Sequence, residues 1–167
     1  MKLIKKIKKA LFFISLNIVW YVKPELATRM YSEFLVKHGA DIDGMPNYLS
    51  AKIWFDGADY SNIKLGKEVT ISSNVRLLTH DWSIYTVAKA HGYFTGEPVG
   101  IHRKISIGDY SFVGTGAILL PGVELGKGVL VGAGSVVRGK IPDHAIVVGN
   151  PAKIVGNTQD FVKKYIS

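Results

Sequence analysis

The sequence contains no cysteine, so disulfide bonds, thiolate nucleophiles and cysteine-based zinc sites are excluded. This absence is compatible with a reducing compartment, and we expect a cytoplasmic location. No membrane-spanning run stands out either. The apolar stretch Ala10–Val22 covers 13 residues and includes Ser15 and Asn17, whereas a spanning helix needs about 20 apolar residues. The stretch "GVELGK" is one residue short of a P-loop, and no G-x-G-x-x-G follows a strand pattern.

The chain has 167 residues, of which 47% are hydrophobic and 20% are charged. This balance indicates a folded chain and not a disordered one, and the length favours a single domain. Glycine is frequent at 18 residues, so the backbone must turn or pack closely at many places.

The formal net charge is +8, but the cations are unevenly placed: five lysines crowd the first nine residues. No nucleic-acid motif accompanies them, so we expect no nucleic-acid partner. A basic segment before an apolar one imitates a secretory signal, yet "KPELATRM" offers no cleavage site. The helical spacing of Ile4, Ile7, Leu11, Ile14 and Ile18 predicts one apolar stripe. We expect residues 1–45 to be helical and residues 1–22 to form either an interfacial helix at the inner face of a membrane or a helix that packs on this protein or a neighbouring subunit.

From Leu65 onward, aliphatic residues recur every six positions, with a single interval of thirty, which is five sixes. A small residue follows many of these aliphatics, and another small or β-branched residue lies four positions after every one of them except Leu77. The aliphatic series is Leu65, Ile71, Leu77, Ile107, Val113, Leu119, Leu125, Val131 and Val137.

A six-residue period predicts a parallel β-helix. Six residues at about 3.3 Å each form one short strand and a corner, so three units close a triangular coil. One aliphatic from each unit then points inward and stacks on its equivalent 18 residues away. A β-sandwich is the alternative for a glycine-rich β protein, but its strands would alternate at irregular spacing.

The run "IGDYSFVGTGAILLPGVELGKGVLVGAGSVV", followed by "IPDHAIVVGNPAKIVG", closely resembles the hexapeptide-repeat acetyltransferases, in the branch of sugar O-acetyltransferases and serine acetyltransferases. The resemblance covers roughly residues 50–156. It implies a left-handed β-helix, an exception to the usual right-handed crossover. It also implies a homotrimer with active sites between subunits and acetyl-CoA as the donor. We expect a β-helical catalytic domain over 46–156, a protruding loop over 79–104, and a short helix in 157–167 that caps the last coil.

The protruding loop begins with the candidate catalytic residue, His80. A histidine in a comparable "TH" context acts as general base in related sugar acetyltransferases, so the resemblance implies this role for His80 in "LLTHDWS". Neutral imidazole, with an ordinary pKa near 6.5, can accept the proton of a hydroxyl group. Asp81 could orient the imidazole, or it could secure the loop, because adjacent strand residues point to opposite faces. Asp56 and Asp59 in "FDGADY" are rival partners and candidate acceptor contacts.

The loop is dense in aromatic and polar residues, which is typical of a functional excursion from a regular scaffold. We assign Trp82, Tyr85 and Tyr93 to the acceptor site, and we treat His91 and His102 as loop residues or acceptor contacts. The three histidines are numerous enough for zinc, but they lack the close paired spacing of zinc hydrases on this fold, so we predict no metal.

By resemblance, the later coils hold the cofactor through Ser111, Phe112, Gly114, Gly132 and Ala133. CoA also carries phosphates, which attract cations. The candidate cations are Arg138, Lys140 and Lys153.

The sequence therefore predicts an acetyl-CoA-dependent O-acetyltransferase that acts on a sugar hydroxyl, with polysaccharide biosynthesis as its setting. The alternatives left open are an N-acetyltransferase of an amino sugar or nucleotide-amino sugar, and a trimeric scaffold without catalysis.

Overall fold

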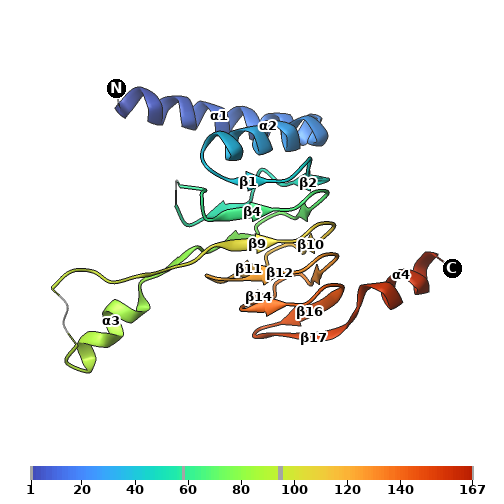
Figure 1. The fold of residues 1–167 in the computed structure, drawn as a ribbon. Coiled ribbons are helices and arrows are strands. Elements are labelled where there is room, and N and C mark those ends of the chain that lie inside the picture. Colours follow the sequence, from blue (N-terminus) through green and yellow to red (C-terminus); the bar gives the residue numbers. More distant parts are fainter. Residues whose placement is uncertain (1, 58, 94–95, 167) are drawn as a thin grey trace.

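Three sheets, in which all neighbouring strands except the last pair are parallel, form the walls of a coil in the computed structural model, which describes residues 2–57, 59–93 and 96–166 (Figure 1). The first sheet contains β1 (Asp41–Ile42), β4 (Ile63–Leu65), β9 (Ile105–Ile107), β12 (Glu124–Leu125) and β15 (Lys140–Ile141). The second contains β2 (Tyr48–Leu49), β5 (Thr70–Ile71), β10 (Phe112–Val113), β13 (Leu130–Val131), β16 (Ala145–Gly149) and β17 (Ala152–Asn157). The third contains β3 (Trp54–Phe55), β6 (Arg76–Leu77), β11 (Ile118–Leu119) and β14 (Val136–Val137). This is the predicted left-handed β-helix.

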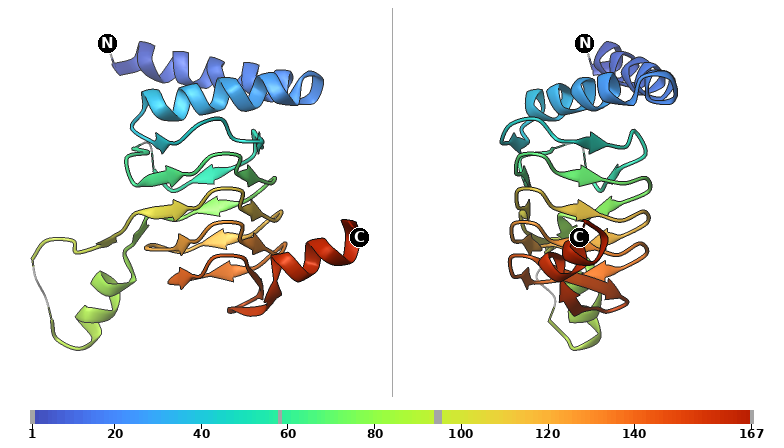
Figure 2. Two further views of the ribbon diagram at one scale, coloured as in Figure 1. Left: turned by 45° about the vertical axis from the view of Figure 1, so that its right-hand side comes forward. Right: turned by 90° about the vertical axis from the view of Figure 1, so that its right-hand side faces the viewer.

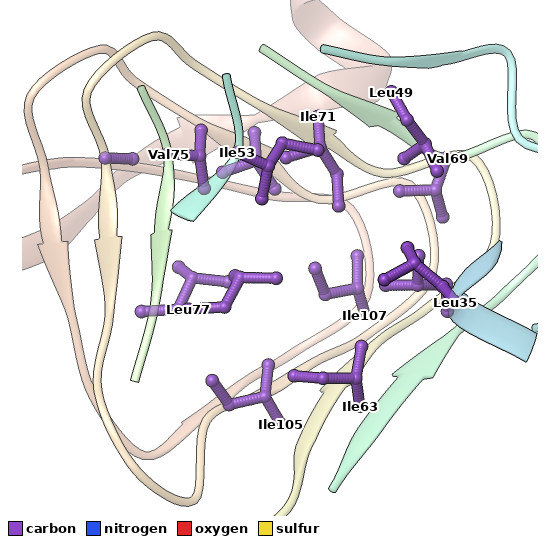
Figure 3. Packing of buried hydrophobic residues seen from close by; sticks show 14 of the residues in the cluster. Leu35, Leu49, Ile53, Ile63, Val69, Ile71, Val75, Leu77, Ile105 and Ile107 are labelled. Atoms are coloured by element: carbon purple, nitrogen blue, oxygen red, sulfur yellow. The ribbon is translucent and has the colours of Figure 1, made fainter. Parts of the chain in front are cut away.

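The strand register stacks the aliphatic positions on one another. Val113 pairs with Val131, and Leu119 pairs with both Leu77 and Val137. These side chains are fully buried, and Figure 3 shows Ile71, Leu77 and Ile107 converging on the interior of the coil. Each fully buried aliphatic side chain contributes roughly 1.5–3 kcal/mol, so the stack stabilises the scaffold along its whole length.

The corners repeat as regularly as the strands. Between the first and second sheets, one residue per coil takes a left-handed conformation, with φ of 55° at Glu68, 58° at Tyr110 and 61° at His144. Glycine holds the equivalent conformation at Gly116 and Gly134 in another corner. His144 thus forms part of a turn.

The first coil begins at Asp41, inside the segment that we assigned to the N-terminal region. Ile42 pairs with Leu65, and Leu49 pairs with Ile71. The six-residue period is not apparent in this coil, because Ile42, Leu49 and Phe55 are not evenly spaced and a longer stretch separates β3 from β4.

Two helices close one end of the coil, α1 (Lys2–Val22) and α2 (Pro24–Lys37) (Figures 1 and 2). Leu35 of α2 is fully buried and points into the coil interior in Figure 3. Helix α1 lies on α2, with the Phe12 ring stacked 4.3 Å from that of Phe34. The Trp20 indole N–H donates a 2.6 Å hydrogen bond to the Tyr48 hydroxyl. None of the helices in the described residues is both long and apolar enough to traverse a bilayer.

Between β6 and β9 the chain leaves the coil and returns (Figure 1). The excursion contains β7 (His80–Asp81), α3 (Ser83–Ala90) and β8 (Ile101–His102). Strands β7 and β8 pair antiparallel, with His80 opposite His102. They form a short stalk that fixes His80 next to the coil.

At the other end of the coil, β17 turns back antiparallel to β16. Helix α4 (Thr158–Ile166) then leads away from the side of the coil instead of covering its end (Figure 1). The Thr158 hydroxyl donates to the Gly128 carbonyl at 2.9 Å and fixes the start of the helix. None of the described residues of α4 is buried, and the helix does not cover the end of the last coil as the sequence predicted (Figure 1).

Candidate active site

His80 forms a close pair with Asp56. Its Nδ1 atom lies 2.9 Å from Asp56 Oδ2, and the side chains are 28% and 7% exposed, respectively. The imidazole is therefore reachable by a ligand, whereas the carboxylate is nearly sequestered. Because the carboxylate can only accept, this contact places a proton on Nδ1 and leaves the Nε2 lone pair available.

Three further hydrogen bonds hold Asp56 in position. Its Oδ2 accepts the backbone N–H of Thr79 at 2.6 Å and that of His80 at 2.9 Å. Its Oδ1 accepts the Thr79 hydroxyl at 2.8 Å. The parallel pairing of β3 and β6, with Phe55 opposite Leu77, brings these segments together. The carboxylate is preorganised, so it can orient the imidazole without a rearrangement.

The other two candidate carboxylates act in their own turns. Asp81 Oδ1 accepts the Ser83 backbone N–H at 2.8 Å, at the start of α3, and this hydrogen bond lowers the pKa of Asp81. Asp59 Oδ1 accepts the Ser61 backbone N–H at 3.0 Å, which lowers the pKa of Asp59 in the same way. The direct contact with the imidazole belongs to Asp56.

Two loop side chains surround His80. The His102 ring stacks on it, with centroids 5.7 Å apart and planes at 28°. The Trp82 indole stands edge-on to both imidazoles, at 6.1 Å from His80 and 5.4 Å from His102. A Cβ atom at Gly100 would lie 2.9 Å from the indole ring, so glycine makes room for Trp82 there. The position of His102 beside His80 depends on the β7–β8 pairing, for which the sequence offered no periodic signal.

Tyr85 and Tyr93 lie farther along the loop. Tyr85 is on α3, where Lys89 Nζ lies 3.9 Å from its ring centre. Tyr93 follows α3 and is 74% exposed. His91 ends α3 and takes no part in the stack of His80 and His102. Within residues 2–57, 59–93 and 96–166, no three histidine, aspartate or glutamate side chains gather as metal ligands would.

The candidate cofactor residues follow the second sheet and the corner after it. Phe112 is exposed on β10, and Ala133 is exposed at the corner. A Cβ atom at Gly114 would lie 2.6 Å from the Ala133 nitrogen, so successive coils meet closely here and leave no room for a side chain at this position. Ser111 differs, because its side chain is buried and bridges two coils: its hydroxyl donates to the Gly126 carbonyl at 2.9 Å and accepts the Val129 N–H at 3.1 Å.

The candidate phosphate ligands are divided between two places. Arg138 follows the third sheet, at the same corner from which the His80 loop leaves in an earlier coil. Lys140 is on β15, where its Nζ lies 3.0 Å from Glu124 Oε2 at the surface. Lys153 is on β17, opposite Val148. The structure therefore does not gather these three cations into one cluster.

Comparisons with known proteins agree with this architecture. Residues 104–139 match the family model described as bacterial transferase hexapeptide (six repeats). A protein of Staphylococcus aureus strain MRSA252 named "putative acetyltransferase" is 34% identical over 122 residues, which cover 64% of this chain and 61% of the relative. A Schizosaccharomyces pombe protein of the same name is 37% identical over 95 residues, covering 57% of this chain and 43% of the relative. The chain thus spans about three fifths or less of the length of these relatives.

Solved structures share the fold. A galactoside acetyltransferase in complex with coenzyme A superposes with a TM-score of 0.61 at 18% identity, covering 93% of this chain and 84% of that one. A hexapeptide-repeat acetyltransferase from Vibrio cholerae gives a TM-score of 0.57 at 18% identity, covering 90% and 88%. Residues 104–139 thus carry the hexapeptide repeats of bacterial transferases, and the coil built from them shares its fold with the hexapeptide-repeat acetyltransferase of Vibrio cholerae.

Proposed function

We propose that this protein is an acetyl-CoA-dependent O-acetyltransferase that acts on a sugar hydroxyl, with His80 as its general base. The observation that carries the proposal is the Asp56–His80 pair, held at the root of a loop that leaves a rigid coil. Related proteins named acetyltransferases and the fold of a coenzyme A complex support the reaction class.

The chemistry needs one proton acceptor and one electrophile. His80 Nε2 removes the proton of the acceptor hydroxyl as its oxygen attacks the thioester carbonyl carbon. The tetrahedral intermediate then collapses, the carbon–sulfur bond breaks, and the sulfur leaves with a proton from the imidazolium. Asp56 stabilises the imidazolium formed between these steps. General base catalysis of this kind supplies about 10²- to 10⁴-fold in rate.

Trp82 and His102 supply the acceptor side of the proposed site. The indole is 44% exposed, and the lack of a side chain at Gly100 leaves room for it beside His80. An aromatic face of this kind packs on the apolar C–H face of a sugar ring, while the imidazole of His102 offers a hydrogen-bonding edge.

The donor side supports a homotrimer. His80 is at the corner after the third sheet, whereas Phe112, Gly114 and Ala133 follow the second sheet and its corner. These are different edges of one triangular coil. A cleft between neighbouring protomers would bring the His80 edge of one chain against the cofactor edge of another, as the family resemblance implies. Size-exclusion chromatography with light scattering tests this part: a mass three times that of the chain is expected, and a monomer that retains activity contradicts it.

N-acetylation of an amino sugar is the second candidate, because the same base and donor would serve an amine. The third is a scaffold that kept the fold without chemistry. The preorganised Asp56–His80 pair favours catalysis over the scaffold, since a scaffold has no need of a buried carboxylate aimed at an accessible imidazole.

Thiol release from acetyl-CoA separates the three candidates. The purified chain is incubated with a panel of free sugars, amino sugars and nucleotide sugars, in the presence of EDTA to exclude a metal requirement. A base-labile ester product supports the proposal, and an amide product supports N-acetylation. If no acceptor causes thiol release from acetyl-CoA, the scaffold without catalysis is the remaining candidate.

The proposed reaction belongs to polysaccharide biosynthesis in the cytoplasm. A cytoplasmic enzyme of polysaccharide biosynthesis would meet its precursors on lipid carriers at the inner face of a membrane.

A further inference from the structure

Helix α1 has two apolar faces, of which its own protein covers one. On the inner face Leu16 is fully buried, and the Phe13 ring meets that of Tyr31 at 6.0 Å. The outer face is the stripe predicted from the sequence, and its five aliphatic side chains are between 50% and 61% exposed. They are Ile4, Ile7, Leu11, Ile14 and Ile18. A continuous exposed row of large aliphatic residues marks an interaction surface, unlike scattered single residues.

The place of α1 in the fold leaves this outer stripe open. Helix α2 lies between α1 and the coil, so α1 is the outermost layer at that end (Figures 1 and 2). Helix α1 also runs across the end of the coil, not along its side. The homotrimer proposed above would form through the sides of the coil, where the His80 edge and the cofactor edge lie. The stripe therefore faces away from both the coil and the sides at which a trimer would form.

The charges around the outer stripe indicate what kind of surface it binds. The first 24 residues contain six lysines and no acidic residue. Lys8 is four positions after Ile4 and three before Leu11, so it flanks the stripe on the helix surface, and Lys6 flanks Leu3 in the same way. Two copies of α1 placed stripe to stripe would bring these like charges together. An anionic surface would neutralise them.

We propose that the outer stripe of α1 and its flanking lysines bind an anionic lipid surface, with the helix lying in the plane of the interface. An apolar stripe bordered by lysines is the arrangement of interfacial helices, and each lysine near an anionic surface contributes about 1 kcal/mol. Because α1 crosses the end of the coil, this contact sets the stacked coils upright on the membrane, with the His80 loop at their side (Figure 1). The inference is independent of the proposed reaction.

Vesicle flotation tests the proposal with the full-length protein. Phosphatidylcholine vesicles are compared with vesicles that also contain phosphatidylglycerol. The wild type is expected to float with the anionic vesicles and not with the neutral ones. Ile7→Glu/Leu11→Glu is expected to abolish binding, and Lys6→Gln/Lys8→Gln to weaken it about thirtyfold. The matched control, Val36→Glu, alters an equally exposed residue on α2 and is expected to bind as the wild type does.

Two results overturn the inference. One is a wild type that binds neither vesicle type, or both equally. The other is an Ile7→Glu/Leu11→Glu variant that elutes as a smaller assembly, which assigns the stripe to a second copy of the chain. Acetyl transfer to a free sugar, measured without vesicles, is expected to be unchanged in all variants, so failure of lipid binding and failure of the proposed reaction are separated.

Discussion

Asp56 Oδ2 lies 2.9 Å from His80 Nδ1, although the two residues are 24 positions apart in the chain. The pairing of β3 with β6 creates this contact, and the bonds from Thr79 keep the carboxylate in place. The orienting carboxylate thus follows a strand of the coil, and the base lies in the short β7–β8 stalk at the base of the loop, so both are held by regular structure.

Replacement of the base tests the reaction directly. We expect His80→Ala to lower kcat by about 10²- to 10⁴-fold, because the hydroxyl loses its proton acceptor. Binding of CoA, measured by calorimetry, and the oligomeric state should be unchanged. His144→Gly is the matched control, since glycine accepts the left-handed corner at this position, and its turnover should equal that of the wild type. Near-full activity in His80→Ala would remove the mechanism.

Variants of two aspartates show which carboxylate orients the His80 imidazole and which has only a structural role. Asp56→Asn removes the charge facing the imidazole, so kcat should fall about ten- to a hundredfold, as expected for the loss of a charged hydrogen bond. Asp81→Asn changes a residue whose carboxylate bonds to Ser83, and its kcat should remain within about twofold of the wild type. Steady-state kinetics on both variants decide the matter, and the reverse order of effects would assign the orienting role to Asp81.

The Asp81 turn should show a defined pH response. Its hydrogen bond from Ser83 lowers the pKa of Asp81 in the folded state. The bond therefore contributes stability above the unfolded-state pKa and is lost as the pH falls through the lower folded-state value. We expect the Ser83 amide resonance to titrate with a midpoint below about 3.9, the ordinary value for aspartate. Asp81→Asn should abolish the titration, whereas a midpoint above the ordinary value would show that the bond is not formed.

The close approach of successive coils can be tested at Gly108. A Cβ atom there would lie 2.5 Å from the Gly126 carbonyl carbon and oxygen, which belong to the backbone of the next coil. Gly108→Ala should therefore lower the free energy of unfolding by about 1–3 kcal/mol. Gly156→Ala meets only the tip of Ile146 at 3.7 Å and should change it by less than about 0.5 kcal/mol. Urea denaturation of both variants measures the difference, and equal effects would contradict the coil geometry at Gly108.

The role of Trp82 in acceptor binding predicts a selective kinetic change. Trp82→Ala should raise the KM for the sugar about tenfold, since one aromatic contact contributes about 0.5–1.5 kcal/mol beyond its buried area. The KM for acetyl-CoA should be unchanged. Trp82→Phe retains an aromatic ring and should recover part of the loss. A parallel rise of both KM values would indicate that the loop had lost its structure.

The sequence by itself determined the coil from Leu65 onward. Its six-residue period is a local property: each strand is short, each corner needs a small residue or a left-handed one, and each buried aliphatic stacks on its equivalent in the next coil. The period also stops just before His80, the residue to which the family resemblance gives the role of base. The periodic signal does not extend into the first coil, whose start at Asp41 precedes the predicted boundary at residue 46, because its longer corners break the period while its strands still pair in register.

Only the tertiary structure decided which groups meet His80. Asp56, Asp59 and Asp81 were all candidates in the sequence, and the register of β3 against β6 selected Asp56. The pairing of β7 with β8 likewise brought His102 onto His80 across an irregular loop. Local periodicity follows from the residues of each repeat, whereas contacts between distant segments depend on how whole coils stack, and no short-range pattern contains that information.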